Sequence, residues 1–140
     1  MPAFTYELPV RFADVDHAGI VYYPRFFHFF HVAFEELWRA KMGARAYSEL
    51  IDRERVGFPC VHAECDFHAP LRFGDSAGIE VTVAKLGTKS ITFRYRVFRI
   101  GDPPTLAAEG RVVCAVVDLA RFVAIPAPGK VTAMLQDLVE

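Results

Sequence analysis

The chain has 140 residues, a length that suits one domain, residues 1–140, with a moderate hydrophobic core. Its formal net charge of −1 lacks the basic excess typical of nucleic-acid-binding proteins, so we expect no nucleic-acid partner. Hydrophobic residues make up 53% of the chain and include 13 phenylalanines. This surplus predicts apolar surface buried against a second copy of the chain as well as in an internal core.

The N-terminal residues and the cysteines favour a cytoplasmic protein. Residues 1–7 have neither a basic start nor an apolar run, so we expect no signal peptide. No uncharged stretch approaches the roughly 20 residues that cross a bilayer, so we expect no membrane partner. Cys60, Cys65 and Cys114 contain no C-x-x-C pair, and we interpret them as reduced, buried thiols without a structural metal site.

The first predicted element is a strand over residues 4–12, where apolar and polar residues alternate weakly. Pro9 places this strand near the edge of a sheet or at a bulge. A short acidic turn follows, with Asp14 and Asp16 two residues apart and Gly19 just after them. Aspartates are common in turns, so both could simply close this one.

A long helix is predicted from Pro24 to about Met42. Phe26, Phe30 and Phe34 recur at helical spacing, and further aromatic residues fill the positions between them. The first half of the helix is therefore apolar nearly all round, and such a helix has to be enclosed. We expect it at the centre of the core.

The remainder of the chain reads as a short helix, four strands and a closing helix. The predicted ranges are a helix over 44–53, strands over 60–69, 77–86, 91–97 and 106–118, and a helix over 131–138. One strand, one long helix and then four strands joined by short turns predict an α+β fold with an antiparallel sheet.

The acidic turn carries a family resemblance. The run Asp14-x-Asp16-x-x-Gly19-x-Val21-Tyr22-Tyr23-Pro24, followed by an aromatic-rich helix, resembles the signature of hotdog-fold acyl-CoA thioesterases of the 4-hydroxybenzoyl-CoA thioesterase family. The resemblance covers nearly the whole chain. It implies the hotdog fold, in which an antiparallel sheet wraps around a long central helix. It also implies a homodimer with the pocket at the subunit interface, and leaves a homotetramer open.

The resemblance assigns the catalytic groups. Asp16 matches the second aspartate of the signature, which implies a catalytic carboxylate that acts either as nucleophile or as general base on water. The backbone N–H of Tyr23 matches the position that polarises the thioester carbonyl. Orphan amides at a helix start suit that task, and a thiolate leaving group needs little acid help. We expect Asp14 to shape the turn through local hydrogen bonds.

The substrate is expected to be an acyl-CoA, with coenzyme A as part of the substrate and no further cofactor. His31 stands where 4-hydroxybenzoyl-specific members carry a carboxylate, a departure that leaves the 4-hydroxybenzoyl group itself open as substrate. Lys89 and Ser90 match a family segment near the CoA. The expected substrate-binding residues are His17, Gly19, Tyr22, Phe27 and His31.

The predicted activity is hydrolysis of an aromatic or short-chain acyl-CoA to the free acid and CoA. A hotdog hydratase or dehydratase is the alternative enzyme, in which His28 or His31 would act with Glu35. A non-catalytic acyl-CoA-binding module is the third hypothesis. Gly74–Gly78 matches the G-x-S-x-G pattern of serine hydrolases, but a strand follows it where that site needs a helix, and we interpret it as a hairpin turn.

Overall fold

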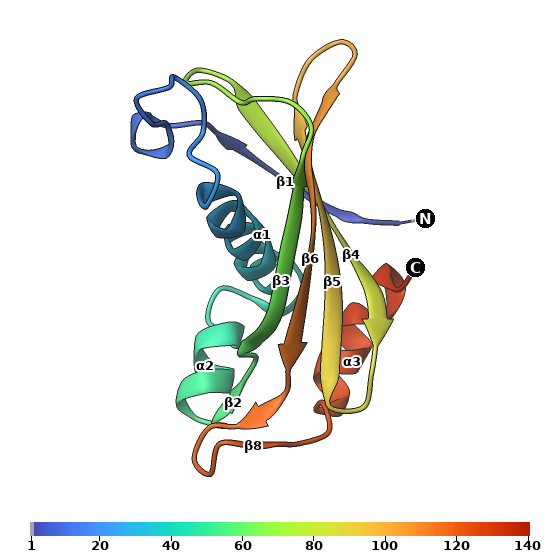
Figure 1. The fold of residues 1–140 in the computed structure, drawn as a ribbon. Coiled ribbons are helices and arrows are strands. Elements are labelled where there is room, and N and C mark those ends of the chain that lie inside the picture. The colour runs from blue at the N-terminus through green and yellow to red at the C-terminus, as the bar shows by residue number, and fades with distance from the viewer. Residues whose placement is uncertain (1) are drawn as a thin grey trace.

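A five-stranded antiparallel sheet forms one layer of the protein, and the long helix α1 (Arg25–Met42) lies against it (Figure 1). The computed structural model describes residues 2–140. The strand order is β1-β4-β5-β6-β3. The strands are β1 (Phe4–Pro9), β3 (Cys60–Phe67), β4 (Ser76–Leu86), β5 (Ser90–Arg99) and β6 (Thr105–Ala115). This arrangement is the α+β architecture predicted from the sequence.

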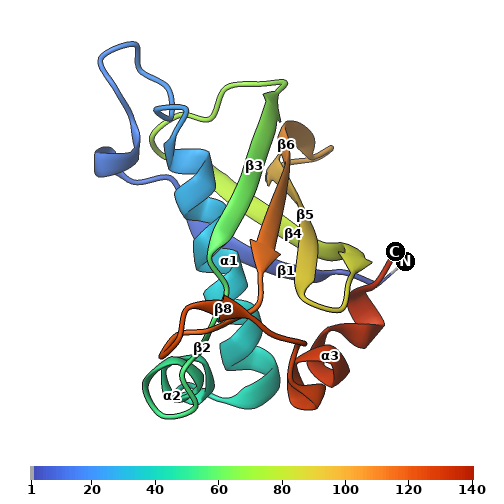
Figure 2. The ribbon, with the colours of Figure 1, turned by 60° about the horizontal axis from the view of Figure 1, so that its bottom comes forward.

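Smaller elements close the two ends of this layer. A second sheet of short strands, in the order β2-β7-β8, lies beside α2, and α3 covers the end of the sheet where β4 turns into β5 (Figure 2). The bounds are η1 (Phe12–Asp14), α2 (Ala46–Asp52), β2 (Val56–Gly57), β7 (Val117–Asp118), β8 (Val123–Ala124), α3 (Gly129–Leu135) and η2 (Gln136–Leu138).

The core lies between one face of α1 and the central strands. Phe29, Leu37 and Trp38 are at most 1% exposed, and the inward residues of β4 and β5 that face the helix layer are equally buried. Each fully buried phenylalanine contributes about 1.5–3 kcal/mol of transfer free energy. The aromatic residues of the helix therefore provide much of the free energy that holds α1 on the sheet.

The opposite face of α1 is open, which corrects the expectation of a fully enclosed helix. His28, His31 and Glu35 are exposed, and Phe27 and Val32 are only half-buried. The reason is geometric, because a single sheet covers a helix from one side only. The helix begins at Arg25, one residue after the predicted start at Pro24.

Three predicted strands are shorter than expected, and the one predicted over 60–69 ends at Phe67. The first ends at Pro9, and residues 12–14 form a 3-10 turn in its place. The last ends at Ala115 because the next N–H, that of Val116, donates to the carbonyl of Lys89, and the chain then pairs with β2.

Gly74 and Asp75 precede β4, and Ser76–Gly78 begin that strand, so no helix follows the serine of the G-x-S-x-G segment. The segment is not the predicted hairpin turn, because β4 does not pair with β3, the strand before it.

Gly110 on β6 lies directly against the ring of Phe30 from α1. A Cβ at this position would lie 2.4 Å from Cε2 of Phe30 and 3.0 Å from the carbonyl oxygen of Glu64. Ala or any larger residue would therefore force the Phe30 ring or the neighbouring β3 backbone to move. The glycine is a packing requirement.

We expect Gly110→Ala to lower the free energy of unfolding by about 1–3 kcal/mol, because the added methyl group overpacks the helix–sheet contact. Urea denaturation followed by circular dichroism measures the change. Gly129→Ala is the matched control, since among residues 2–140 its added Cβ would meet no atom within 4 Å beyond its own helix and chain neighbours. Equal effects of the two substitutions would show that Phe30 adapts at no cost.

Candidate active site

Asp14 holds the turn that precedes α1. Its buried carboxylate accepts the backbone N–H of Arg11 at 2.8 Å and the guanidinium of Arg25 at 2.6 and 3.0 Å. Its carbonyl oxygen accepts the N–H of Tyr22 at 2.9 Å. The carboxylate thus joins both sides of the turn to the first residue of the helix. Asp14 has the turn-shaping role predicted for it.

Asp16 lies in the same segment but is exposed. Its Oδ1 accepts the N–H of Ala18 at 2.8 Å, and its backbone exchanges hydrogen bonds of 3.0 Å with Gly19 and Ile20. Gly19 has a φ of +86°, a conformation that glycine adopts readily and that closes this small loop. The loop presents one carboxylate oxygen of Asp16 outward with no protein partner among residues 2–140.

The amide of Tyr23 is available at the start of α1. Pro24 precedes the helix, and the N–H groups of Arg25 and Phe26 donate to Tyr22 and Tyr23 carbonyls. The Tyr23 N–H has no acceptor within the described part of the chain. An unpaired amide at the positive end of a helix dipole can polarise a carbonyl oxygen.

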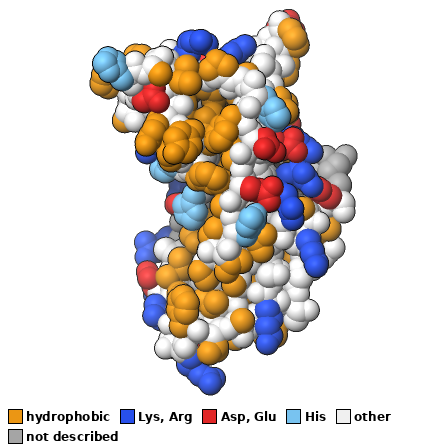
Figure 3. Space-filling model, viewed as in Figure 1, with side chains coloured by type: hydrophobic (Ala, Val, Ile, Leu, Met, Phe, Trp, Pro, Cys, Tyr) orange, Lys and Arg blue, Asp and Glu red, His pale blue; other side chains and the backbone are white. Residues whose placement is uncertain are grey.

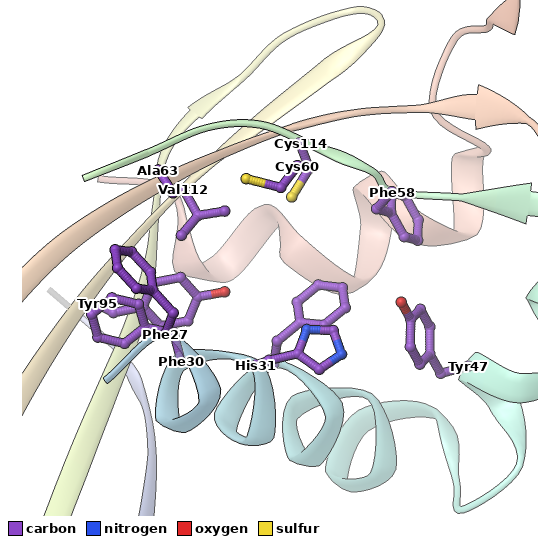
Figure 4. Close-up of a pocket in the computed structure, with 11 residues that line it drawn as sticks. Phe27, Phe30, His31, Tyr47, Phe58, Cys60, Ala63, Tyr95, Val112 and Cys114 are labelled. Carbon is purple, nitrogen blue, oxygen red and sulfur yellow. The ribbon is translucent and has the colours of Figure 1, made fainter. Parts of the chain in front are cut away.

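A cavity of about 320 Å³ opens between α1 and β3, and we call it the aromatic pocket (Figure 4). Helix residues form one side of it, and α2 and the sheet form the others. Its lining consists of Phe27, Phe30, His31, Phe34, Tyr47, Phe58, Cys60, Ala63, Tyr95, Val112 and Cys114. Cavities of this size lined by aromatic side chains with a few polar groups are typical ligand sites.

A second apolar hollow, of about 510 Å³, lies nearer the acidic turn. Tyr23 and Phe26 line it from the helix side, and Phe67 lines it from the end of β3. The rings of Phe26 and Phe67 pack edge to face with centroids 5.3 Å apart. On the face drawn in Figure 3, hydrophobic side chains form patches over α1 and β3.

The polar groups of the aromatic pocket stay neutral or paired. His31 Nε2 lies 3.0 Å from Glu35 Oε2, and both side chains are more than half exposed. Burial, with a smaller contribution from Glu35, raises the pKa of Tyr47 to about 12. Burial also raises the pKa of Cys114 to about 12. The tyrosine hydroxyl and the thiol are therefore protonated at neutral pH.

Cys60 is exposed at the start of the edge strand, which corrects the expectation that all three thiols are buried.

Some of the predicted site residues line one of the two cavities, and others line neither. Phe27 and His31 line the aromatic pocket, and Tyr23 lines the second hollow. His17, Gly19 and Tyr22 are exposed in the turn and line neither cavity.

Of the predicted CoA contacts, Lys89 lies in the turn between β4 and β5, and Ser90 is the first residue of β5. That turn is at the opposite end of the sheet from the loop between β1 and α1, the loop that contains Asp16 (Figure 1).

Tyr47 and Tyr95 are pocket residues that the sequence prediction missed. Both have the spacing of ordinary core aromatics, and nothing local marks their hydroxyl groups.

The comparison with known families decides the class of protein. A model described as the thioesterase-like superfamily matches residues 10–137. The chain belongs to this superfamily. The 1,4-dihydroxy-2-naphthoyl-CoA hydrolase of Nostoc punctiforme is 35% identical over 80% of this chain and 74% of its own length.

Solved structures of thioesterases have the same fold as this chain. A 1,4-dihydroxy-2-naphthoyl-CoA thioesterase from Synechocystis superposes with a TM-score of 0.88 at 26% identity and 98% coverage of both chains. A gentisyl-coenzyme A thioesterase superposes with a TM-score of 0.79 at 30% identity, over 94% of this chain and 98% of the other. The hotdog fold and the predicted class of enzyme, a thioesterase, are confirmed. Within residues 2–140, no helix combines the length and the hydropathy needed to cross a bilayer.

The Asp14–Arg25 pair gives a prediction about the turn. We expect Arg25→Met to lower the free energy of unfolding by about 1–3 kcal/mol, because it leaves a buried carboxylate without its charged donor. Arg45→Met is the control, since the Arg45 side chain is 81% exposed and its pair with Glu49 spans 3.6 Å. Urea midpoints of the two variants measure the difference. A loss no larger than that of the control would mean that the pair does not hold the turn.

Proposed function

We propose that this thioesterase hydrolyses an aromatic acyl-CoA, with Asp16 as the catalytic carboxylate and the Tyr23 N–H as the donor to the carbonyl oxygen. The observation that carries the proposal is the unpaired Tyr23 amide at the start of α1, in the same short segment as the outward carboxylate of Asp16. A thioester needs little more than this, because its carbonyl is poorly conjugated and a thiolate leaves readily.

Hydrolysis can follow either of two routes, which differ in what attacks the carbonyl carbon. Attack of the Asp16 carboxylate on the carbonyl carbon would form a mixed anhydride and expel CoA as the thiolate, and water would then cleave the anhydride. Alternatively, Asp16 would accept a proton from water while the oxygen of that water attacks the same carbon. In both routes the Tyr23 N–H stabilises negative charge on the carbonyl oxygen.

The aromatic pocket supports an aromatic acyl group. Ring faces and edges of Phe27, Phe30 and Phe34 surround a space open enough for a fused ring system. The relatives named above act on hydroxylated aromatic acyl groups, 1,4-dihydroxy-2-naphthoyl and gentisyl. We therefore propose a hydroxylated aromatic acyl-CoA of the naphthoyl class. His31 in place of a carboxylate argues against 4-hydroxybenzoyl-CoA as the main substrate.

We propose a homodimer formed through the free edge of β3. β3 ends the five-stranded sheet, so one row of its backbone N–H and C=O groups has no strand partner in the described part of the chain. Val61 and Phe67 on this strand are 64% and 49% exposed. Such an edge pairs readily with its own copy about a two-fold axis, which would join two sheets into one. Pairing of two dimers into a tetramer stays a prediction.

This dimer would complete the site. An antiparallel β3 pair brings the Cys60 end of one copy to the Phe67 end of the other. The Tyr23 ring lies against Phe67, with centroids 6.3 Å apart, so the catalytic turn of one copy would approach the aromatic pocket of its partner. The Lys89 turn of the partner would move to the same side, where its ammonium could hold CoA phosphates.

We expect Asp16→Asn to lower kcat for an aromatic acyl-CoA by at least roughly 100-fold with little change in stability, because the amide neither attacks nor accepts a proton. A thiol-release assay measures kcat, and thermal unfolding checks the fold. Asp52→Asn, an exposed residue at the end of α2, is the control. Wild-type kcat in the Asp16 variant would rule out the assignment.

A mixed dimer tests which chain supplies which part of the site. Asp16→Ala removes the carboxylate, and Val112→Trp fills the aromatic pocket from β6. Two differently tagged chains, each inactive alone, are co-expressed and the heterodimer is purified by both tags. If sites are shared between chains, one of its two sites is intact and activity returns to about half of the wild-type value. Activity at background, or failure to isolate any heterodimer, would contradict the shared site.

The His31–Glu35 pair favours one alternative, hydration of an enoyl-CoA. That reaction needs a histidine beside a carboxylate, and the predicted pair forms at the mouth of the pocket. Loss of enoyl absorbance without release of thiol would support hydration. Release of thiol from naphthoyl-CoA with no change in the enoyl-CoA would support hydrolysis.

A further inference from the structure

Tyr95 is a buried tyrosine whose hydroxyl reaches the aromatic pocket. It lies in the middle of β5, is 3% exposed overall, and lines the cavity. Figure 4 shows its oxygen pointing toward the interior of the pocket, and the oxygen of Tyr47 doing so from the opposite end. A phenylalanine would fill the same place in the core equally well.

The ring of Tyr95 is held in one position. Phe30 stacks on it with centroids 4.7 Å apart and an interplanar angle of 10°. Gly110 is the register partner of Tyr95 on β6, and its missing side chain gives Phe30 the room to lie flat. The ring of Phe93, tilted by 34°, lies with its centroid 6.1 Å from that of Tyr95. The hydroxyl therefore has a fixed direction.

The Tyr95 hydroxyl has no protein partner. None of the side-chain hydrogen bonds found among residues 2–140 involves it, and the only fully buried side-chain polar atom without a partner in that range is Nε1 of Trp38. The hydroxyl is thus open to the cavity. Burial, with smaller effects from Cys114, Tyr47 and Cys60, holds the pKa of Tyr95 well above its ordinary value. The group is a neutral donor at any physiological pH.

We propose that Tyr95 is the specificity residue of the aromatic pocket and donates a hydrogen bond to a ring oxygen of the bound acyl group. The pocket would then select aromatic acyl groups with a hydroxyl or keto oxygen on the ring over unsubstituted aromatic or aliphatic ones. A site built to pair a buried polar group discriminates strongly against ligands that leave it unpaired. This inference rests on the proposed function, because it takes the aromatic pocket as the acyl site.

The other polar groups of the pocket are less suited to this selection. His31 is held by Glu35 and its side chain is 57% exposed, so water competes for it. Cys60 and Cys114 are weak donors. Tyr47 stacks on Trp38 and Phe58 at the far end and can serve a second ring oxygen. Tyr95 alone combines a strong donor, full burial and a fixed ring.

Binding of two simple probes tests the proposal without requiring turnover. 1-Naphthol and naphthalene differ only in a hydroxyl, and titration calorimetry gives their dissociation constants. We expect the wild-type protein to bind 1-naphthol roughly tenfold more tightly than naphthalene. Tyr95→Phe should abolish this preference while leaving naphthalene affinity and thermal stability unchanged or improved. Tyr6→Phe, on β1 outside the aromatic pocket, should keep the preference.

The outcomes separate the two claims. An unchanged preference in Tyr95→Phe, or its loss only in Tyr47→Phe, would overturn the role of Tyr95. Absence of binding by both probes in a protein that still hydrolyses aromatic acyl-CoA would also overturn it, and the proposed function would stand. A Tyr95-dependent preference in a protein that releases no thiol from any aromatic acyl-CoA would support the binding role and contradict the proposed activity.

Discussion

The position of α1 on the sheet determines where a ligand can enter. The helix packs against β4 and β1, and its Phe30 ring lies over Gly110 on β6. Because α1 lies nearer to β4 and β1, the space beside β3 is left open and becomes the aromatic pocket. The ring of Phe30, which packs α1 against the sheet, also stacks on the ring of Tyr95. Packing of the core and shaping of the site are therefore one arrangement, and a change at Gly110 would disturb both.

The two carboxylates of the turn before α1, Asp14 and Asp16, have different roles. Asp14 is buried, paired with Arg25 and bonded to the backbone, so its charge is used to fix the turn. Asp16 keeps a free oxygen on the outside because Gly19 closes a small loop beneath it. A rigid support beneath an uncommitted carboxylate is what a nucleophile or general base requires.

The sequence predicted the local features well and the long-range ones less so. The turn from Asp14 to Pro24 and the helix after it depend on neighbours in the chain, and their positions were correct to about one residue. The exposed face of α1 was not predictable, because phenylalanines on several sides of the helix hid the stripe formed by His28, His31 and Glu35. Tyr95 was read as core because alternation along a strand cannot show where a hydroxyl points.

A crystal structure with a non-hydrolysable ketone analogue of 1,4-dihydroxy-2-naphthoyl-CoA, in which a methylene group separates the carbonyl from the sulfur, tests the central claim most directly. The account predicts the carbonyl oxygen of the analogue at hydrogen-bond distance from the Tyr23 N–H, the Asp16 carboxylate beside the carbonyl carbon, and the rings in the aromatic pocket. An acyl group bound away from the start of α1, with Asp16 facing bulk water, would contradict it.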